Sequence, residues 1–253
     1  MLKILATADI HSPRYLSLFM KSIEEIDEEP DLIIFAGDNV DKNNVYAFKP
    51  IYEYVMKNYD RKPVLSIFGN EEYRGFENKY IELYNGFKWL NNEYTVLEIA
   101  GYKVGVIGTR GALDKPTPWQ ARNIPGIYKY YRELPLTISK MFDMIRGKGV
   151  DIVILVSHYG VTYKNLEGEP EHIWAYLASK RFEEIIKSKK PDLVIHGHVH
   201  KGVKELVYID HVPVYNVSLP ARGKVVLIKY KLKPDSKREE ISGLYKWLKK
   251  SGD

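Results

Sequence analysis

Residues 2–11 read Leu-Lys-Ile-Leu-Ala-Thr-Ala-Asp-Ile-His. An apolar run occupies residues 2–8 and stops abruptly at an aspartate and a histidine, Asp9 and His11. Short runs of this composition, rich in branched aliphatic residues, are typical of strands buried on both faces of a sheet. Four later runs end in the same abrupt way, at residues 32–36, 64–68, 152–156 and 193–195.

Helical patterns lie between the early strands. In residues 16–26 the apolar side chains recur at helical spacing, as Leu16, Phe19, Met20, Ile23 and Ile26. Ser12-Pro13 predicts the start of this helix and Pro30 predicts its end. Alternation of strands and helices predicts parallel βαβ units, and so an α/β fold.

The second half of the chain changes its pattern. Residues 95–99 and 103–107 predict a hairpin that turns at Ala100-Gly101, and residues 203–231 are rich in hairpin signals, so we expect mixed sheets. Residues 108–131 have no clean period and predict a long loop beside the site. Further helices are expected at residues 136–146, 180–189 and 236–250. We expect one domain over residues 1–235, with residues 236–253 as a C-terminal helix of the same domain.

Composition sets limits on the class of protein. The 253 residues are 45% hydrophobic and 28% charged, which is ordinary for a folded globular chain. Because there is no cysteine, disulfides, thiolate metal sites and a cysteine nucleophile are excluded. No apolar stretch resembles a signal peptide or a membrane span, so we expect a cytoplasmic protein with no membrane partner. The net charge of +5 suits an anionic substrate, although much of the basic excess lies after Gly223 and is typical of a solvated tail.

The polar residues that carry chemistry follow the predicted strands. Ligands bind beyond the carboxyl ends of the strands in open α/β sheets. Five strand ends carry ionisable or amide side chains there: Asp9 and His11, Asp38, Asn70 with Glu71 and Glu72, His158, and His196 with His198 and His200. Asp9 and His11 are two residues apart, as are His198 and His200, so in an extended segment each pair points to one side and can share an ion.

Such a set of donors predicts metal binding. Several unpaired acids and imidazoles at adjacent strand ends would each be unfavourable by several kcal/mol without a cation. Mixed oxygen and nitrogen donors suit Mn²⁺, Fe, Co, Ni or Zn²⁺ and also permit Mg²⁺. Seven candidate ligands are too many for one ion, so we expect two divalent cations that share a carboxylate. His196 alternates with the ligand pair, and either a supporting hydrogen bond or simple packing accounts for it.

The ordered series Asp-x-His, Gly-Asp, Gly-Asn, His and Gly-His-x-His resembles the calcineurin-like metallophosphoesterase superfamily over residues 9–200. The resemblance implies two mixed β-sheets packed face to face with helices outside, a four-layer αββα sandwich. It also implies that Asp38 bridges two metal ions. By similarity, the first ion is held by Asp9, His11, Asp38 and His200. By similarity, the second ion is held by Asp38, Asn70, His158 and His198.

One residue departs from the pattern of the family. Many members carry a histidine after the Gly-Asn, where it protonates the leaving group or stabilises the transition state, and this chain has Glu71. A carboxylate beside two cations stays ionised and is a poor general acid at neutral pH. It also repels a doubly charged monoester more than a singly charged diester. We therefore predict a preference for phosphodiesters, the alternative being that Glu71 turns away and pairs with Arg74 or Arg14.

The predicted reaction is hydrolysis of a phosphate ester by metal-bound hydroxide, without a covalent intermediate. Asn70 and His158 would hold the phosphate beside the second ion, with Arg110 and Arg122 of the long loop as further candidates for binding it. The substrate is expected to be a phosphorylated small molecule or a nucleotide.

Three other functions compete with this one. A nuclease would need a basic groove beside the ions, and the chain has only a modest positive excess, so nucleic acid stays an alternative substrate. A phosphomonoesterase is the second alternative. A non-catalytic scaffold is the third, and the complete set of ligand positions argues against it.

Overall fold

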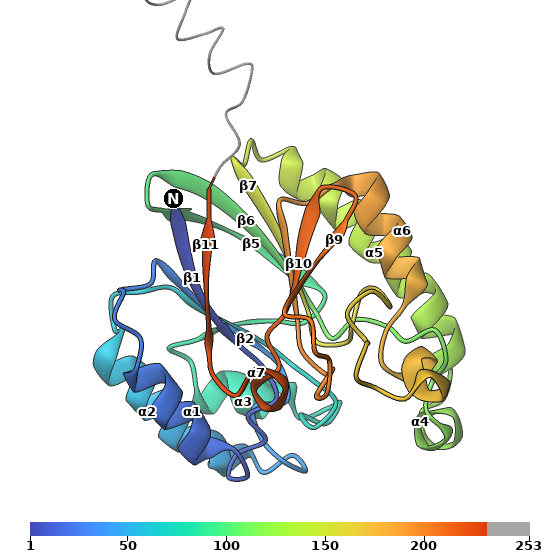
Figure 1. Ribbon diagram of the computed structural model, residues 1–253, viewed down its shortest axis with the longest axis horizontal. Helices are drawn as coiled ribbons and strands as arrows, with labels where there is room; N and C mark the ends of the chain where they lie inside the picture. Colours follow the sequence, from blue (N-terminus) through green and yellow to red (C-terminus); the bar gives the residue numbers. More distant parts are fainter. Residues whose placement is uncertain (232–253) are drawn as a thin grey trace, which may run out of the picture.

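The computed structural model describes residues 1–231, and they form two β-sheets packed face to face between two layers of helices (Figure 1). This is the predicted α/β sandwich of two mixed sheets, and the prediction is confirmed. The C-terminal helix expected at residues 236–250, and the domain boundary at residue 235, lie outside the described residues. Within residues 1–231, no helix has the length and apolar character needed to cross a membrane.

The first sheet has the order β11-β1-β2-β3-β4. Four strands run parallel, and β11 is antiparallel to β1. Its strands are β1 (Leu2–Thr7), β2 (Leu32–Ala36), β3 (Val64–Ile67), β4 (Lys88–Leu90) and β11 (Val226–Tyr230). Three of them were predicted from apolar runs, whereas β4 has only three residues and no such signal.

The second sheet has the order β5-β6-β7-β8-β10-β9. The four central strands are parallel, and the edge strands β5 and β9 are antiparallel to their neighbours. The strands are β5 (Glu93–Ile99), β6 (Tyr102–Thr109), β7 (Ile152–Ser157), β8 (Leu193–His196), β9 (Leu206–Ile209) and β10 (Val212–Asn216). The predicted hairpin is β5–β6, and the later hairpin is β9–β10.

Alternation along each strand divides the apolar side chains between layers. In β2, Ile34 packs in the core between the two sheets, while Ile33 and Phe35 face the helices of the first sheet. In β7, Ile154 lies in the same central core and Leu155 faces the helices of the second sheet. Both faces of these strands are buried, which explains why their sequences are continuously apolar.

The helices cover the two outer faces (Figure 1). The first sheet is covered by α1 (Leu16–Glu24), η1 (Val45–Phe48), α2 (Lys49–Asn58) and α3 (Glu77–Leu83). The second sheet is covered by α5 (Ile127–Arg146) and α6 (Lys180–Lys189). Three short helices complete the described chain: α4 (Pro118–Asn123), η2 (Glu171–Tyr176) and α7 (Leu219–Arg222).

Two predictions about helices were wrong. Helix α1 begins at Leu16 and not at Ser12-Pro13, because Ser12 Oγ donates to the carbonyl of Ala47 and is not used as a helix cap. The predicted loop 108–131 contains α4 and the first turns of α5, which begins at Ile127. Pro135 interrupts the helical hydrogen bonding, but Tyr131 and Ile138 on either side of it are buried against the sheet and hold the helix together.

Candidate metal centre

The seven predicted ligands lie in loops that follow strands of both sheets, at the carboxyl ends of β1, β2, β3, β7 and β8. Because the two sheets pack face to face, these loops meet at one end of the sandwich. Residues far apart in sequence are therefore neighbours, and Asp9 Oδ2 accepts a hydrogen bond from the backbone N–H of His198 at 2.8 Å.

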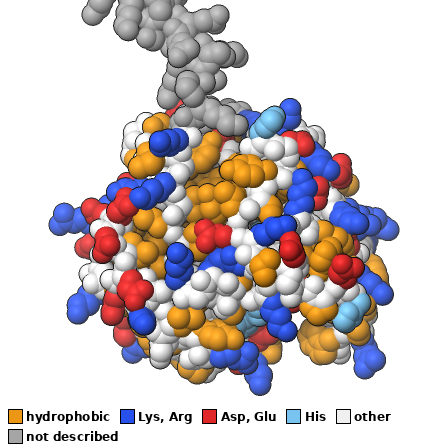
Figure 2. All heavy atoms as spheres, viewed as in Figure 1, with side chains coloured by type: hydrophobic (Ala, Val, Ile, Leu, Met, Phe, Trp, Pro, Cys, Tyr) orange, Lys and Arg blue, Asp and Glu red, His pale blue; other side chains and the backbone are white. Residues whose placement is uncertain are grey.

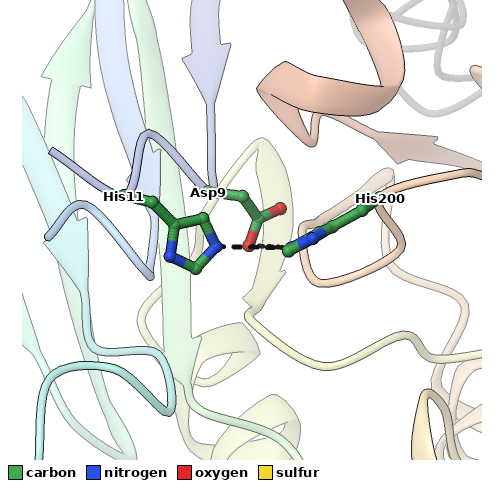
Figure 3. A group of neighbouring side chains, drawn as sticks. All are labelled: Asp9, His11 and His200. Atoms are coloured by element: carbon green, nitrogen blue, oxygen red, sulfur yellow. Dashed lines mark hydrogen bonds and ion pairs between the residues drawn. The ribbon is translucent and has the colours of Figure 1, made fainter. Parts of the chain in front are cut away.

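The first cluster consists of Asp9, His11 and His200, whose candidate ligand atoms all lie within 4.8 Å of one another. His200 Nε2 is 3.4 Å from Asp9 Oδ1 and 3.4 Å from His11 Nε2. Figure 3 shows the two imidazole rings on either side of the Asp9 carboxylate. Asp9 comes shortly after β1, whereas His200 comes from the loop after β8.

The second cluster consists of Asp38, His158 and His198, again within 4.8 Å. His158 Nδ1–H donates to the carbonyl of Ala36 at 3.0 Å, which leaves Nε2 facing the cluster. Nε2 lies 3.1 Å from Asn70 Oδ1 and 3.4 Å from Asp38 Oδ2. Asn70 thereby joins this cluster.

Asp38 lies between the clusters. Its Oδ1 accepts the backbone N–H of Glu71 at 2.7 Å, which fixes the orientation of the carboxylate. The other oxygen, Oδ2, is 3.4 Å from His158 Nε2 in the second cluster and 3.9 Å from His11 Nε2 in the first. One carboxylate oxygen is therefore close to donor atoms of both clusters.

The backbone that carries these ligands is unusual. Asp9, His11, Asp38 and His198 have φ values of 60°, 44°, 51° and 66°, in the left-handed region that non-glycine residues rarely occupy. Such strain is characteristic of functional sites. The argument from extended strand ends was wrong, because β1 ends at Thr7 and β8 at His196, before the ligands. His198 and His200 accordingly belong to different clusters.

The pKa values reflect strong coupling inside the site. Burial alone would raise the pKa of Asp9, but the imidazoles of His200, His158 and His11 outweigh burial and hold it well below its usual range. Burial opposes the charge on His158, yet the carboxylates of Asp38 and Asp9 raise its pKa to about 9. Burial and the neighbouring His158 lower the pKa of His198 to about 3. A divalent cation would replace the proton of His158 as the partner of these carboxylates.

The donor set fits divalent metal ions. His198 Nδ1 is buried and has no hydrogen-bond partner within residues 1–231, and Asp9 Oδ1 is buried with only the ion-pair contacts to His200 and His158. Leaving a buried polar atom such as His198 Nδ1 without a partner is unfavourable by about 1–3 kcal/mol. Bound cations would satisfy both atoms, and the carboxylate, imidazole and amide donors match the ligand preferences of transition-metal ions.

Glu71 lies beside the second cluster, and its carboxylate is held between Asn70 and the backbone of Lys42. Its Oε2 accepts the backbone N–H of Lys42 at 2.7 Å, and its Oε1 is 3.4 Å from Asn70 Nδ2. The expected alternative pairs do not form, because Arg14 pairs with Asp41 and the Arg74 guanidinium lies over the ring of Tyr130. The contact with Asn70 directs the amide nitrogen toward Glu71 and the amide oxygen toward His158.

Glu72 is a functional residue for which sequence reasoning gave no role. Its side chain is fully buried and accepts backbone N–H groups from two ligand loops. The donors are Gly69 at 2.7 Å, Asp38 at 2.9 Å, Asn39 at 2.7 Å and Val40 at 3.3 Å. Burial and the nearby Asp38 raise its pKa to about 7, against these hydrogen bonds. The sequence feature that could have pointed to Glu72 is its position directly after the Gly-Asn-Glu turn.

The two arginines predicted to bind substrate are placed differently. Arg110 is 4% exposed, and its guanidinium donates to the carbonyls of Gly69 and Glu72 and pairs with Glu77 at 2.8 Å. Its donors hold the Asn70 loop, which argues against the predicted contact with substrate. Arg122 lies in α4 and is exposed to solvent.

His196 has a supporting position behind the ligand loop. Its Nε2 is hydrogen bonded to Asn165 Nδ2, and burial lowers its pKa to about 4, so the ring is neutral. Asn216 Nδ2 donates to the carbonyl of Val199 at 2.9 Å, in the middle of the Gly-His-x-His segment. The hydrogen-bonding interpretation of His196 therefore agrees with the structure.

Comparison with solved structures shows the same fold in proteins of low sequence identity. A 5′-nucleotidase precursor from Thermus thermophilus has a TM-score of 0.53 and 16% identity, covering 91% of this chain and 53% of its own. A protein described as a 5′-nucleotidase from Staphylococcus aureus has a TM-score of 0.57 and 16% identity, covering 98% and 58%. The calcineurin-like phosphoesterase YfkN from Bacillus subtilis has a TM-score of 0.51 and 16% identity, covering 91% and 86%.

The chain thus spans little more than half the length of the two 5′-nucleotidase structures. A comparison with curated proteins gives no significant match. The profile of the calcineurin-like phosphoesterase family matches residues 2–202, the range that contains every residue of both clusters. The chain belongs to the calcineurin-like phosphoesterase family.

Proposed function

We propose that this metal-dependent phosphoesterase holds two divalent ions and hydrolyses phosphodiesters in preference to phosphomonoesters. The observation that carries the two-ion proposal is the position of Asp38 Oδ2, which is 3.4 Å from His158 and 3.9 Å from His11. The first ion would be held by Asp9, His11, Asp38 and His200. The second ion would be held by Asp38, Asn70, His158 and His198.

The side chains are prepared for these roles by their hydrogen bonds. The Glu71 N–H fixes Asp38, the Ala36 carbonyl fixes the His158 ring, and the Glu71 carboxylate orients the Asn70 amide. When bound, paired divalent ions activate water as the nucleophile and neutralise charge on the phosphoryl oxygens. Mn²⁺, Fe, Co, Ni or Zn²⁺ suits this donor set.

The preference for diesters rests on the charge of Glu71. Within residues 1–231 no lysine or arginine side chain forms an ion pair with it, so its negative charge is not neutralised beside the second cluster. A monoester dianion carries one more negative charge than a diester. At a separation of a few ångströms beyond contact, repulsion of that extra charge amounts to about 1 kcal/mol, or a factor of about five in rate.

A second candidate function is hydrolysis of nucleoside 5′-monophosphates. It is favoured by two of the structural neighbours, which are described as 5′-nucleotidases. At 16% identity, this likeness concerns the fold. The Glu71 charge favours the diester over this candidate.

A substrate panel separates the two candidates. Purified protein loaded with Mn²⁺ is assayed on bis(p-nitrophenyl) phosphate, p-nitrophenyl phosphate and a set of nucleoside 5′-monophosphates. We expect the highest kcat/KM for the diester and a shift toward monoesters in Glu71→His. Glu82→Gln removes an exposed acid from α3 and serves as the matched control. A large monoester preference in the wild-type protein would remove the diester proposal and establish the second candidate.

A further inference from the structure

His198 differs from the other members of the second cluster in what orients its side chain. The His158 ring is fixed by the Ala36 carbonyl, and the Asn70 amide by Glu71. Within residues 1–231, neither ring nitrogen of His198 has a hydrogen-bond partner, and its hydrogen bond to Asp9 comes from the backbone N–H. Metal-binding imidazoles are ordinarily oriented by a hydrogen bond to the ring nitrogen that does not bind the ion. The orientation of the His198 ring therefore depends on packing.

Tyr159 packs against the ring of His198. The two ring centroids are 4.7 Å apart and the ring planes meet at 75°, which is an edge-to-face arrangement. Tyr159 also lies against His158, with the ring centroids 5.3 Å apart. The other ring contacts of His198 within residues 1–231 are with His158 and His200, which are themselves predicted ligands. Among these contacts, Tyr159 is therefore the one aromatic side chain from outside the ligand set.

The backbone of Tyr159 is held firmly. Its N–H donates to the carbonyl of Arg110 at 3.0 Å, and its carbonyl accepts from Ser157 Oγ at 2.7 Å. Gly111 has a φ of 81°, and a Cβ at this position would collide with Ser157 Oγ and lie 3.3 Å from Tyr159 Cβ. Because the residue is also only 4% exposed, its ring has little freedom to move away from His198.

The side chain of Tyr159 is anchored by α4 and α5. Gln120 Nε2 donates to the Tyr159 hydroxyl at 3.0 Å. The oxygen of the same amide accepts the backbone N–H of Thr117 at 3.0 Å, as part of the capping box that begins α4. Since the amide oxygen is used in this way, the amide nitrogen is directed toward Tyr159. From α5, the buried ring of Tyr131 adds an edge-to-face contact with a centroid separation of 6.1 Å.

The outward side of α4 carries no comparable signal. Trp119 is 66% exposed, and Arg122 is exposed to solvent. Figure 2 shows apolar, acidic and basic side chains interspersed over one face of the molecule, and scattered exposed side chains of this kind are ordinary in globular proteins. Gln120, in contrast, is only 8% exposed. The buried side of α4 is therefore the side that bears on the metal centre.

We propose that Tyr159 is a positioning residue, which holds the His198 imidazole in the orientation that binds the second ion, with Gln120 and Tyr131 as its supports. This role rests on the proposed function, because it requires an ion bound by His198. The edge-to-face contact orients the ring without the increase in basicity that an accepting carboxylate would give. The capping box of α4 thus reaches the metal centre through a single tyrosine ring.

Binding of Co²⁺ to the metal-free full chain tests this role without any substrate. A titration followed by the visible absorption of Co²⁺ gives the affinity of each ion site. We expect Tyr159→Met to weaken the binding of one of the two ions by about 10- to 100-fold and to change its absorption spectrum. Tyr159→Phe keeps the ring and should restore this affinity to within about threefold of the wild-type value. Wild-type affinity for both ions in Tyr159→Met would overturn the proposal.

Two variants of α5 control for loss of packing alone. Tyr131→Leu and Phe142→Leu each remove a buried aromatic ring from the same core, but Phe142 lies about three helical turns beyond the residue that contacts Tyr159. Both should lower the melting temperature, and we expect only Tyr131→Leu to weaken binding of the second ion, by about threefold or more.

This pair decides the question if Tyr159→Met does not fold, since equal Co²⁺ affinities in Tyr131→Leu and Phe142→Leu would overturn the proposal. The wild-type titration separates this failure from a failure of the proposed function. A wild-type protein that binds no divalent ion would refute the two-ion phosphoesterase itself. Two ions bound by the wild-type protein and bound equally well by Tyr159→Met would refute only the positioning role.

Discussion

Asp38 Oδ2 lies 3.4 Å from His158 Nε2, and both side chains are excluded from solvent. A buried carboxylate and imidazole at this distance, joined by His11 at 3.9 Å, form the point where the two clusters meet. Removing the charge of Asp38 should therefore affect both ion sites at once, whereas loss of a ligand to one cluster affects mainly that cluster.

We expect Asp38→Asn to lose bound metal and to lower kcat/KM by at least about a hundredfold, since even residues that only support a ligand cause losses of about 10- to 100-fold. Metal content measured by mass spectrometry and hydrolysis of a p-nitrophenyl ester check this. Asp27→Asn, an exposed acid after α1, is the control and should match the wild-type protein. Retention of two ions by Asp38→Asn would contradict the bridging role.

Replacing Glu72 should destabilise the protein more than any exposed acid. In Glu72→Gln an amide N–H₂ would face four backbone N–H donors, so some of these buried donors would lose their acceptor. We expect this to lower the free energy of unfolding by about 2–3 kcal/mol. For a chain of this size we expect the melting temperature to fall by roughly 5–10 °C. Calorimetry of Glu72→Gln beside Glu82→Gln measures the difference, and similar melting temperatures for the two variants would show that the buried carboxylate is not needed.

Arg110 should act on stability and not on substrate affinity. Arg110→Met removes the hydrogen bonds to the Gly69 and Glu72 carbonyls and the ion pair with Glu77. We expect a loss of about 2–4 kcal/mol in the free energy of unfolding, because buried acceptors and a partly buried acid lose their partner. Urea denaturation gives this value, and KM should stay within about twofold of the wild-type value. A KM increase without loss of stability would restore the original prediction that Arg110 binds the phosphate.

The chelated protein should become less stable as pH rises from about 6.5 to 9. Burial opposes protonation of His158, but Asp38 and Asp9 raise its pKa from 6.5 to about 9 in the folded state. The stabilisation from protonated His158 is fully present below about pH 6.5, where this histidine is also protonated in the unfolded chain. It is lost as the pH rises through the pKa of His158 in the folded state. The expected loss in the free energy of unfolding is on the order of 3 kcal/mol. Urea denaturation in EDTA measures it, and His158→Gln should reduce the pH dependence. A stability that is flat or rises over this window would show that His158 is neutral in the fold.

Much of the fold could be predicted because its signals are local. Residues 32–36 are continuously apolar for the physical reason that both faces of β2 are buried, and the structure has the strand at those residues. The alternation with helices then predicts parallel pairing. The start of α5 was missed because Pro135 normally ends a helix, and only the tertiary contacts of Tyr131 and Leu134 outweigh that preference.

The sequence predicted which residues form the site, but it did not predict their geometry. The order of acids and imidazoles after the strands indicated which residues meet. The left-handed backbone at Asp9 and His198 has no local signal, because neither residue is glycine and the surrounding structure imposes the conformation. The role of Glu72 depends on backbone N–H groups contributed by another loop, and such a contact leaves no trace in side-chain spacing.

The pairing of β1 with β11 has a consequence for how the protein is made. Leu2 lies opposite Tyr230, so β1 receives one of its two neighbours only from β11, the last strand of residues 1–231. Until then, one edge of β1 has unpaired N–H and C=O groups that any other strand can recruit. During translation the nascent chain therefore carries an open, apolar edge beside the future metal ligands. A truncation upstream of Val226 would leave that edge exposed for good and should yield aggregates rather than a smaller enzyme.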